Sequence, residues 1–108
     1  MNKLIFFQCT TLKFGRYSHT CFLVFACKSN INGMWQQNHC GIYRTANGGD
    51  YWEDISDKTG EANFGFAIAA DLKNENTVWV VPAISDGIRV AINNSVCVCR
   101  TGNDGKSW

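Results

Sequence analysis

Apolar residues along this chain occur in short runs separated by glycine, asparagine and aspartate, a pattern that predicts strands joined by tight turns. The strongest run, "TCFLVFAC" at 20–27, is typical of a buried strand. Further strands are predicted at 51–56, 64–71, 77–83 and 96–101, with 84–94 as a long, irregular hairpin loop that has a strand-like middle. No stretch has a convincing helical period. The sequence therefore predicts an all-β fold with antiparallel strands in meander order.

One short motif occurs twice, as "RTANGGDYW" at 44–52 and "RTGNDGKSW" at 100–108, each time after an apolar run. Aligned residue by residue, the copies pair Thr45 with Thr101, Asn47 with Asn103, Gly49 with Gly105 and Trp52 with Trp108. Glycine supplies positive φ at little steric cost, and an asparagine side chain can accept hydrogen bonds from nearby backbone amides. We therefore predict two equivalent turns, each closed by a tryptophan that packs on the sheet, with a structural rather than catalytic role.

Composition narrows the possible partners. The 108 residues are enough for one domain, and ten basic against nine acidic residues leave a formal net charge of +1 with no cluster of either sign. Nucleic-acid or membrane-surface binding needs a basic patch, so neither partner is expected. Neither a secretory leader nor a membrane-spanning segment is evident, so the expected compartment is cytoplasmic by default.

The six cysteines allow more than one interpretation. The favoured one is buried, reduced thiols that pack as small hydrophobic groups, since Cys97 and Cys99 alternate along a strand at a spacing that does not favour a bridge. A zinc site formed by His39, Cys40, Cys97 and Cys99 is the alternative, although the chain has no C-x-x-C pair. His39 is expected to be structural more readily than a ligand or an acid-base group. No metal and no cofactor are predicted.

The two boxes resemble the Asp-box, or BNR repeat, whose pattern is Ser/Thr, any residue, Asp, any residue, Gly, any residue, Thr, Trp. Here Asn47 and Asn103 stand where Asp is usual, and Tyr51 stands where Thr is usual. The stretches "QQNHCGIYRTANGGDYWEDISD" and "FGFAIAADLKNENTVWVVPA" are similar to bacterial BNR-repeat proteins of the sialidase-like or glycosyl hydrolase-like group, with Leu72 and Glu75 in place of expected prolines. The resemblance covers about residues 35–108.

This resemblance implies a β-propeller of about seven or eight blades, or a tandem of two propellers, of which the chain would supply about one and a half blades. We therefore expect an incomplete propeller over 34–108, a fragment of a longer protein, preceded by an unassigned and possibly non-native segment over 1–33. The other blades of the parent protein would then be obligatory partners, since a propeller closes by pairing its first and last blades.

Catalysis has little support in these residues. A sialidase resembling the enzymatic members of the family would need three converging arginines, and Arg44 and Arg100 look like repeat features instead. The available arginines are Arg16, Arg44, Arg89 and Arg100. Another glycosidase would need two facing carboxylates. The candidates are Asp50, Glu53, Asp54, Asp57, Glu61, Asp71 and Asp86. None is predicted to be catalytic.

Two functions remain open at this point. The first is a non-catalytic binding or scaffold module whose partner is an unknown protein or glycan. The second is part of a carbohydrate-active, exo-sialidase-like hydrolase whose catalytic residues lie outside this chain. The tryptophans are expected to pack in the core, and a sugar-stacking platform is the alternative if one is exposed. The four tryptophans are Trp35, Trp52, Trp79 and Trp108.

Overall fold

The computed structural model describes residues 6–7, 12–14, 17–19, 23–27, 30–38, 40–85 and 87–108. Within these residues every regular element is a β-strand except a single 3-10 turn, Ile92–Asn94, and every strand pairing is antiparallel. The predicted all-β, antiparallel architecture is confirmed. No helix in this part of the chain is long and apolar enough to cross a bilayer.

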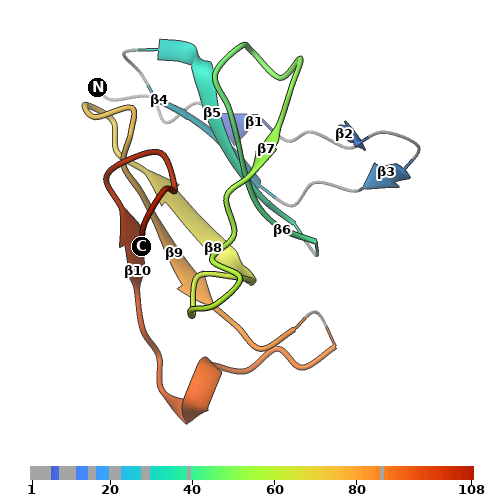
Figure 1. Ribbon diagram of the computed structural model, residues 1–108, viewed down its shortest axis with the longest axis vertical. Helices are drawn as coiled ribbons and strands as arrows, with labels where there is room; N and C mark the ends of the chain where they lie inside the picture. Colours follow the sequence, from blue (N-terminus) through green and yellow to red (C-terminus); the bar gives the residue numbers. More distant parts are fainter. Residues whose placement is uncertain are drawn as a thin grey trace.

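The larger sheet has five strands in the order β1-β4-β5-β6-β7 (Figure 1). They are β1 Phe6–Phe7, β4 Leu23–Cys27, β5 Asn30–Asn38, β6 Gly41–Thr45 and β7 Glu53–Asp54. From β4 to β7 each strand pairs with its successor, so the four form a meander. A separate hairpin joins β2, Leu12–Phe14, to β3, Tyr17–His19.

The second sheet has three strands, β8 Gly65–Ala70, β9 Val78–Pro82 and β10 Cys99–Thr101, again in meander order. Strand β8 packs against β4 and β5 of the larger sheet. At Gly65 a side chain would overlap the carbonyl of Val81 and lie 2.7 Å from Nε2 of Gln37, so only glycine allows this close approach.

The hydrophobic core lies between the two sheets. Its buried members come from both sheets and from the segment that connects them. They are Trp35, Ile42, Ile55, Ala62, Ile68, Val78 and Val80, with Ala70, Cys99 and Trp108 packed against them. Apolar burial of this kind is the main favourable contribution to folding. The core therefore joins two strand units that contain the two copies of the repeated motif.

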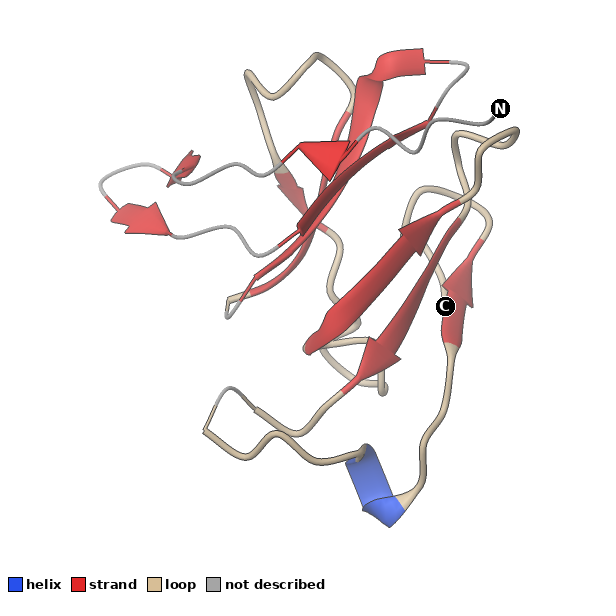
Figure 2. Cartoon of the chain, turned by 180° about the vertical axis from the view of Figure 1, so that it is seen from behind, coloured by secondary structure: helices blue, strands red, loops and turns tan. Residues whose placement is uncertain are grey.

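Several predicted strands differ in extent from those observed. The 51–56 segment forms only the two-residue strand β7, and the 96–101 segment forms only β10. Between β9 and β10 the chain makes a long excursion, closed at its base by the bridge between Ala83 and Ala91 and ending at the 3-10 turn, the blue element in Figure 2. Asn93 and Asn94 in this turn have positive φ of 53° and 55°.

Strand β5 is the longest of the strands that the pattern of apolar residues does not predict. Its last residues, Gln36, Gln37 and Asn38, are polar yet at most 1% exposed, because β5 is the central strand of its sheet and β8 covers it. The strand also runs through residue 33, where the sequence suggested a boundary between an unassigned segment and the repeat region. That division of the chain stays a prediction.

Candidate functional site

The first copy of the motif forms a turn directly after β6. Oγ1 of Thr45 accepts hydrogen bonds from the backbone N–H groups of Asn47 (3.3 Å) and Gly49 (3.1 Å) and donates to Oδ1 of Asn47 (2.9 Å). The same Oδ1 accepts from the backbone N–H of Tyr51 (3.0 Å). Gly48 and Gly49 have positive φ of 74° and 99°, which glycine adopts without strain. The side chains of the motif thus satisfy the backbone of their own turn.

The second copy repeats this network after β10. Oγ1 of Thr101 accepts from the backbone N–H groups of Asn103 (3.3 Å) and Gly105 (2.9 Å) and donates to Oδ1 of Asn103 (2.9 Å). That Oδ1 accepts from the backbone N–H of Ser107 (3.0 Å), as in the first turn. The Asn103 amide also donates to Oγ of Ser107 (2.8 Å), a bond that the first turn lacks because Tyr51 occupies the equivalent position.

A second repeated feature precedes each turn. Trp35 on β5 pairs in register with Arg44 on β6, and the guanidinium carbon lies 5.2 Å from the centre of the indole ring. Trp79 on β9 pairs in the same way with Arg100 on β10, at 5.9 Å. Cation-π contacts at this distance are favourable. Alignment of the two boxes pairs Arg44 with Arg100 but does not pair the two tryptophans. The number of residues between each tryptophan and its arginine differs in the two copies.

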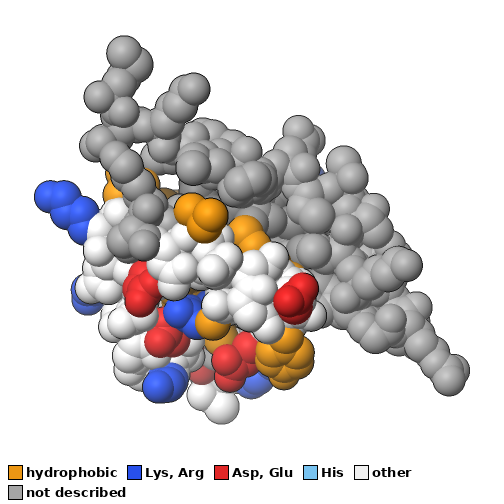
Figure 3. Space-filling model, turned by 90° about the horizontal axis from the view of Figure 1, so that it is seen from above, with side chains coloured by type: hydrophobic (Ala, Val, Ile, Leu, Met, Phe, Trp, Pro, Cys, Tyr) orange, Lys and Arg blue, Asp and Glu red, His pale blue; other side chains and the backbone are white. Residues whose placement is uncertain are grey.

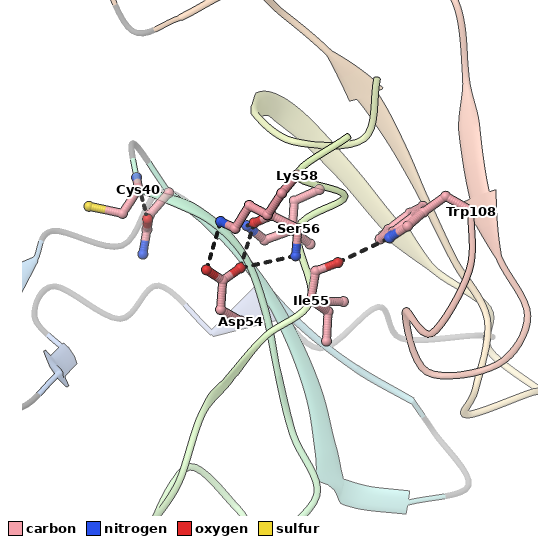
Figure 4. A network of polar contacts seen from close by, with 8 residues as sticks. Cys40, Asp54, Ile55, Ser56, Lys58 and Trp108 are labelled. Atoms are coloured by element: carbon pink, nitrogen blue, oxygen red, sulfur yellow. Dashed lines mark hydrogen bonds and ion pairs between the residues drawn. The ribbon is translucent and has the colours of Figure 1, made fainter. Parts of the chain in front are cut away.

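The two turns are tied to each other. Nε of Arg44 lies 2.9 Å from Oδ1 of Asp104, so an arginine before the first turn forms an ion pair with a residue of the second. The indole Nε1 of Trp108 donates to the carbonyl of Ile55 at 3.0 Å, across 53 residues of sequence (Figure 4). A side chain at Gly105 would overlap that of Ile55. The second turn therefore packs closely on the segment that follows the first.

A cleft of about 370 Å³ lies where these segments meet. Its lining is mainly polar and comes from the strand exit after β7 and from the second turn. The lining residues are Ser56, Asp57, Lys58, Gly105, Lys106, Ser107 and Trp108. On the face of the molecule seen in Figure 3, cationic and anionic side chains lie interspersed, without a field of one sign.

A polar network borders this cleft (Figure 4). Oδ1 of Asp54 accepts from Oγ of Ser56 at 2.6 Å, and Oδ2 accepts from Nζ of Lys58 at 2.8 Å. Burial alone would raise the pKa of Asp54, but the hydrogen bonds from Lys58 and Ser56 outweigh it and hold the pKa below its usual value. Oγ of Ser56 also accepts from the backbone N–H of Ile42, so this hydroxyl is engaged both as a donor and as an acceptor within the structure.

Three of the carboxylates considered for glycosidase chemistry, Asp54, Asp57 and Asp71, accept backbone hydrogen bonds. Oδ1 of Asp71 accepts from the backbone N–H groups of Lys73 (2.8 Å) and Asn74 (3.0 Å), and these bonds lower its pKa. Oδ1 of Asp57 accepts from the backbone N–H of Gly60 at 3.0 Å. A glycosidase acid needs a raised pKa. Both described carboxylates with a shifted pKa, Asp54 and Asp71, are shifted the other way.

The arginines do not converge. Within the described residues each guanidinium lies over a different ring: Arg44 over Trp35, Arg89 over Phe66 and Arg100 over Trp79. Three candidate residues from the sequence, Arg16, His39 and Asp86, lie outside the described residues. The side chains of His19 and of the first three cysteines also lie outside them. No tryptophan is exposed: Trp35 and Trp52 are buried, and Trp79 and Trp108 are half-buried.

The cysteines correct one expectation. Cys40 is exposed and Cys97 and Cys99 are half-buried, so the three described cysteines are not the fully buried thiols predicted, although no disulfide joins them. Strand β10 is a sheet edge, which leaves the face of Cys97 and Cys99 partly open. Their sulfur atoms lie close to a carboxylate oxygen of Glu61. No sequence pattern had linked Glu61 to these cysteines.

No protein-family model matches the chain, and no curated protein sequence matches it.

Proposed function

We propose that this chain is part of a β-propeller built from Asp-box repeats and that its role is a non-catalytic binding or scaffold module. The observation that carries the proposal is the identity of the two turn networks, in which Thr45 and Thr101 play the same role, as do Asn47 and Asn103. A motif whose polar atoms are used up within the turn contributes stability and spacing rather than chemistry.

The strand order supports the propeller part of this proposal. Strands β4 to β7 form a four-stranded antiparallel meander with the first turn between the third and fourth strands. Strands β8 to β10 form the first three strands of a second such unit, with the second turn again after the third. Propeller blades are four-stranded meanders, and propellers have at least about four of them. The two units described would therefore need further blades for closure.

The parent gene offers a direct test. Coding sequence on either side of this chain should contain further Ser/Thr-x-Asn/Asp-x-Gly boxes that end in Trp, at intervals of roughly 50 residues. Each should be preceded by a strand pair in which Trp and Arg can face one another, as Trp35 and Arg44 do. A parent gene whose coding sequence holds no additional box would overturn the propeller proposal.

The binding role is tested at the cleft. We infer that the cleft between 56–58 and 105–108 is where a glycan or protein segment docks, because its rim carries Lys58 and Lys106 beside the edge of Trp108. A glycan array and a pull-down with the parent protein should identify a ligand whose binding falls in the K106A variant. Lys73, which does not line the cleft and whose backbone N–H donates to Oδ1 of Asp71, supplies the matched control K73A. Equal binding by both variants would exclude this cleft.

The hydrolase alternative makes a different prediction for the parent protein. If the parent protein is a carbohydrate-active hydrolase, it should turn over fluorogenic sialosides or other aryl glycosides. We expect no turnover that depends on Asp54 as a general acid, because its ion pair with Lys58 keeps it a carboxylate. Saturable hydrolysis by the parent protein would replace the binding module by an enzyme, and hydrolysis that persists in D54N would place the catalytic residues outside this chain.

A further inference from the structure

The cluster formed by Glu61, Cys97 and Cys99 is separate from the cleft and from both turns. One ligand atom from each of these residues lies within 4.8 Å of the other two, the only such cluster of metal-ligand side chains in the described part of the chain. Sγ of Cys97 lies 3.2 Å from Oε2 of Glu61, although 36 residues separate them in sequence. We propose that these three side chains form a binding site for one zinc ion.

The positions of the ligands follow from the fold. Cys99 is the first residue of β10 and packs its side chain against the core, and Cys97 precedes it by two residues, a spacing that places both on one face of an extended chain. Glu61 lies on the loop after β7, next to Ala62, which is 1% exposed. Ala62 therefore fixes the end of the loop that carries the carboxylate against the core.

The loop itself is well braced. The backbone N–H of Asp57 donates to the carbonyl of Ala62 at 2.8 Å, which closes the loop. Oδ1 of Asp57 accepts from the backbone N–H groups of Thr59 and Gly60 inside it, and a side chain at Gly60 would overlap the Asp57 carboxylate. A braced loop loses little further freedom when its carboxylate binds a metal, and this favours binding.

The ligand chemistry selects the metal. Two thiolates with one carboxylate suit zinc, whose bonds to sulfur are about 2.3 Å and to carboxylate oxygen about 2.0–2.2 Å. In a tetrahedral site such ligand atoms stand roughly 3.5–3.8 Å apart, so the cluster needs only side-chain adjustment to reach this geometry. Three protein ligands leave the fourth position to water, and the exposure of Glu61 gives water access to it.

The two thiols bind a metal only after losing their protons, so proton release is part of the binding step. The hydrogen bond with Glu61 raises the pKa of Cys97 to about 11. Burial raises the pKa of Cys99 and outweighs the lowering effect of a hydrogen bond with Cys97, and the charges of Glu61 and Asp57 raise it further. Without a cation the two sulfur atoms therefore keep their protons. Zinc would bind them as thiolates and release two protons, because the positive charge reverses the cost of placing anions together.

Cobalt substitution tests the site on the full chain, reduced and free of metal. Titration with Co²⁺ should give a thiolate-to-cobalt charge-transfer band at one equivalent, and added Zn²⁺ should remove it. C97S and C99S should lose the band, whereas C40S, which removes an exposed thiol outside the cluster, should keep it. E61Q should keep the band but bind at least about tenfold more weakly, a loss of about 1.4 kcal/mol.

Circular dichroism and tryptophan fluorescence of the metal-free variants show whether loss of the band reflects loss of the ligand or loss of the fold. Three results would overturn the proposal. The first is a wild-type chain without the band, and the second is a band that survives in folded C97S and C99S. The third is a Cys97–Cys99 disulfide found by mass spectrometry after mild reduction. Binding by E61Q as tight as wild type would remove Glu61 from the site.

Discussion

Replacing Thr101, which is 1% exposed, with valine removes one hydroxyl at the start of the second turn and leaves the shape of the side chain nearly unchanged. The hydroxyl accepts hydrogen bonds from the backbone N–H groups of Gly105 and Asn103 and donates to Oδ1 of Asn103. In the variant both N–H groups lose their acceptor inside the protein. Buried donors left without an acceptor are costly, whereas hydrogen bonds lost at an exposed surface are replaced by water.

The size of the effect follows from these bonds. The bond from Gly105 (2.9 Å) and the bond to Asn103 Oδ1 (2.9 Å) are well formed, and the bond from the Asn103 N–H is longer at 3.3 Å. At about 0.5–1.5 kcal/mol for each, we expect T101V to lower the free energy of unfolding by about 2–3 kcal/mol. For a domain of this size that corresponds to a fall in melting temperature of roughly 10–20 °C.

Urea unfolding followed by tryptophan fluorescence measures this loss, since Trp108 closes the affected turn. Thr77 provides the matched control because it is also 1% exposed and its hydroxyl has no hydrogen-bond partner among the described residues. T77V should therefore be neutral or slightly stabilising. T45V removes the equivalent hydroxyl of the first turn, with bonds of similar length, and should cost as much as T101V.

Free energies of unfolding of T101V and T77V that agree within about 0.5 kcal/mol would refute this account, because substitutions that touch no special feature usually fall in that range. In that case the turn networks would contribute no measurable stability. Unequal costs for T45V and T101V would refute a narrower claim, that the two turns are energetically equivalent. A changed slope of unfolding free energy against urea would instead indicate a change in the denatured state.

Three further changes probe the contacts around the turns. W108F keeps one aromatic ring but removes the bond from the indole N–H to the carbonyl of Ile55 together with part of the packed indole surface, and should cost at least about 1 kcal/mol in urea unfolding. No change would show that neither the bond nor the lost packing contributes to stability. A double-mutant cycle of R44Q and D104N should give a coupling of roughly 0.5–1 kcal/mol that shrinks in high salt, whereas zero coupling would dismiss the ion pair. Burial and the charge of Asp54 raise the pKa of Tyr43 to about 12, above its ordinary value of 10.0. The contribution of the neutral Tyr43 side chain to folding stability is therefore complete below about pH 10 and is lost as the pH rises towards 12. Y43F should abolish that alkaline loss, and an ultraviolet titration in which every tyrosine ionises near pH 10 would contradict it.

The turns could be predicted from the sequence because their interactions are local. Each connects residues two to four positions apart, so the Thr-x-Asn-x-Gly pattern contains every side chain that the network uses. The apolar runs at 64–71 and 77–83 likewise contained β8 and β9. In such segments one short stretch of sequence carries the whole signal, whether it is the period of a strand or the chemistry of a turn.

The remaining features depend on residues that are distant in sequence. Gln36 and Gln37 are polar and are buried only because β8 packs over their strand, a tertiary effect that outweighs their surface preference. The ion pair of Arg44 with Asp104 and the approach of Glu61 to Cys97 likewise require the two sheets to be in place. Their partners are not adjacent in any pattern, which is why the sequence predicted the turns but not the contacts between them.

The bond from Trp108 to Ile55 also has a consequence for the rate at which the molecule folds. It closes a loop of 53 residues, and the entropy cost of closing a flexible loop of that length is about 3.5 kcal/mol above the constant term. The bonds inside each turn close loops of only two to four residues and can form early. Contacts of long sequence separation slow folding. We therefore expect the turns to form before the sheets meet, with the docking of Trp108 on the far strand exit as a late step whose loss mainly accelerates unfolding.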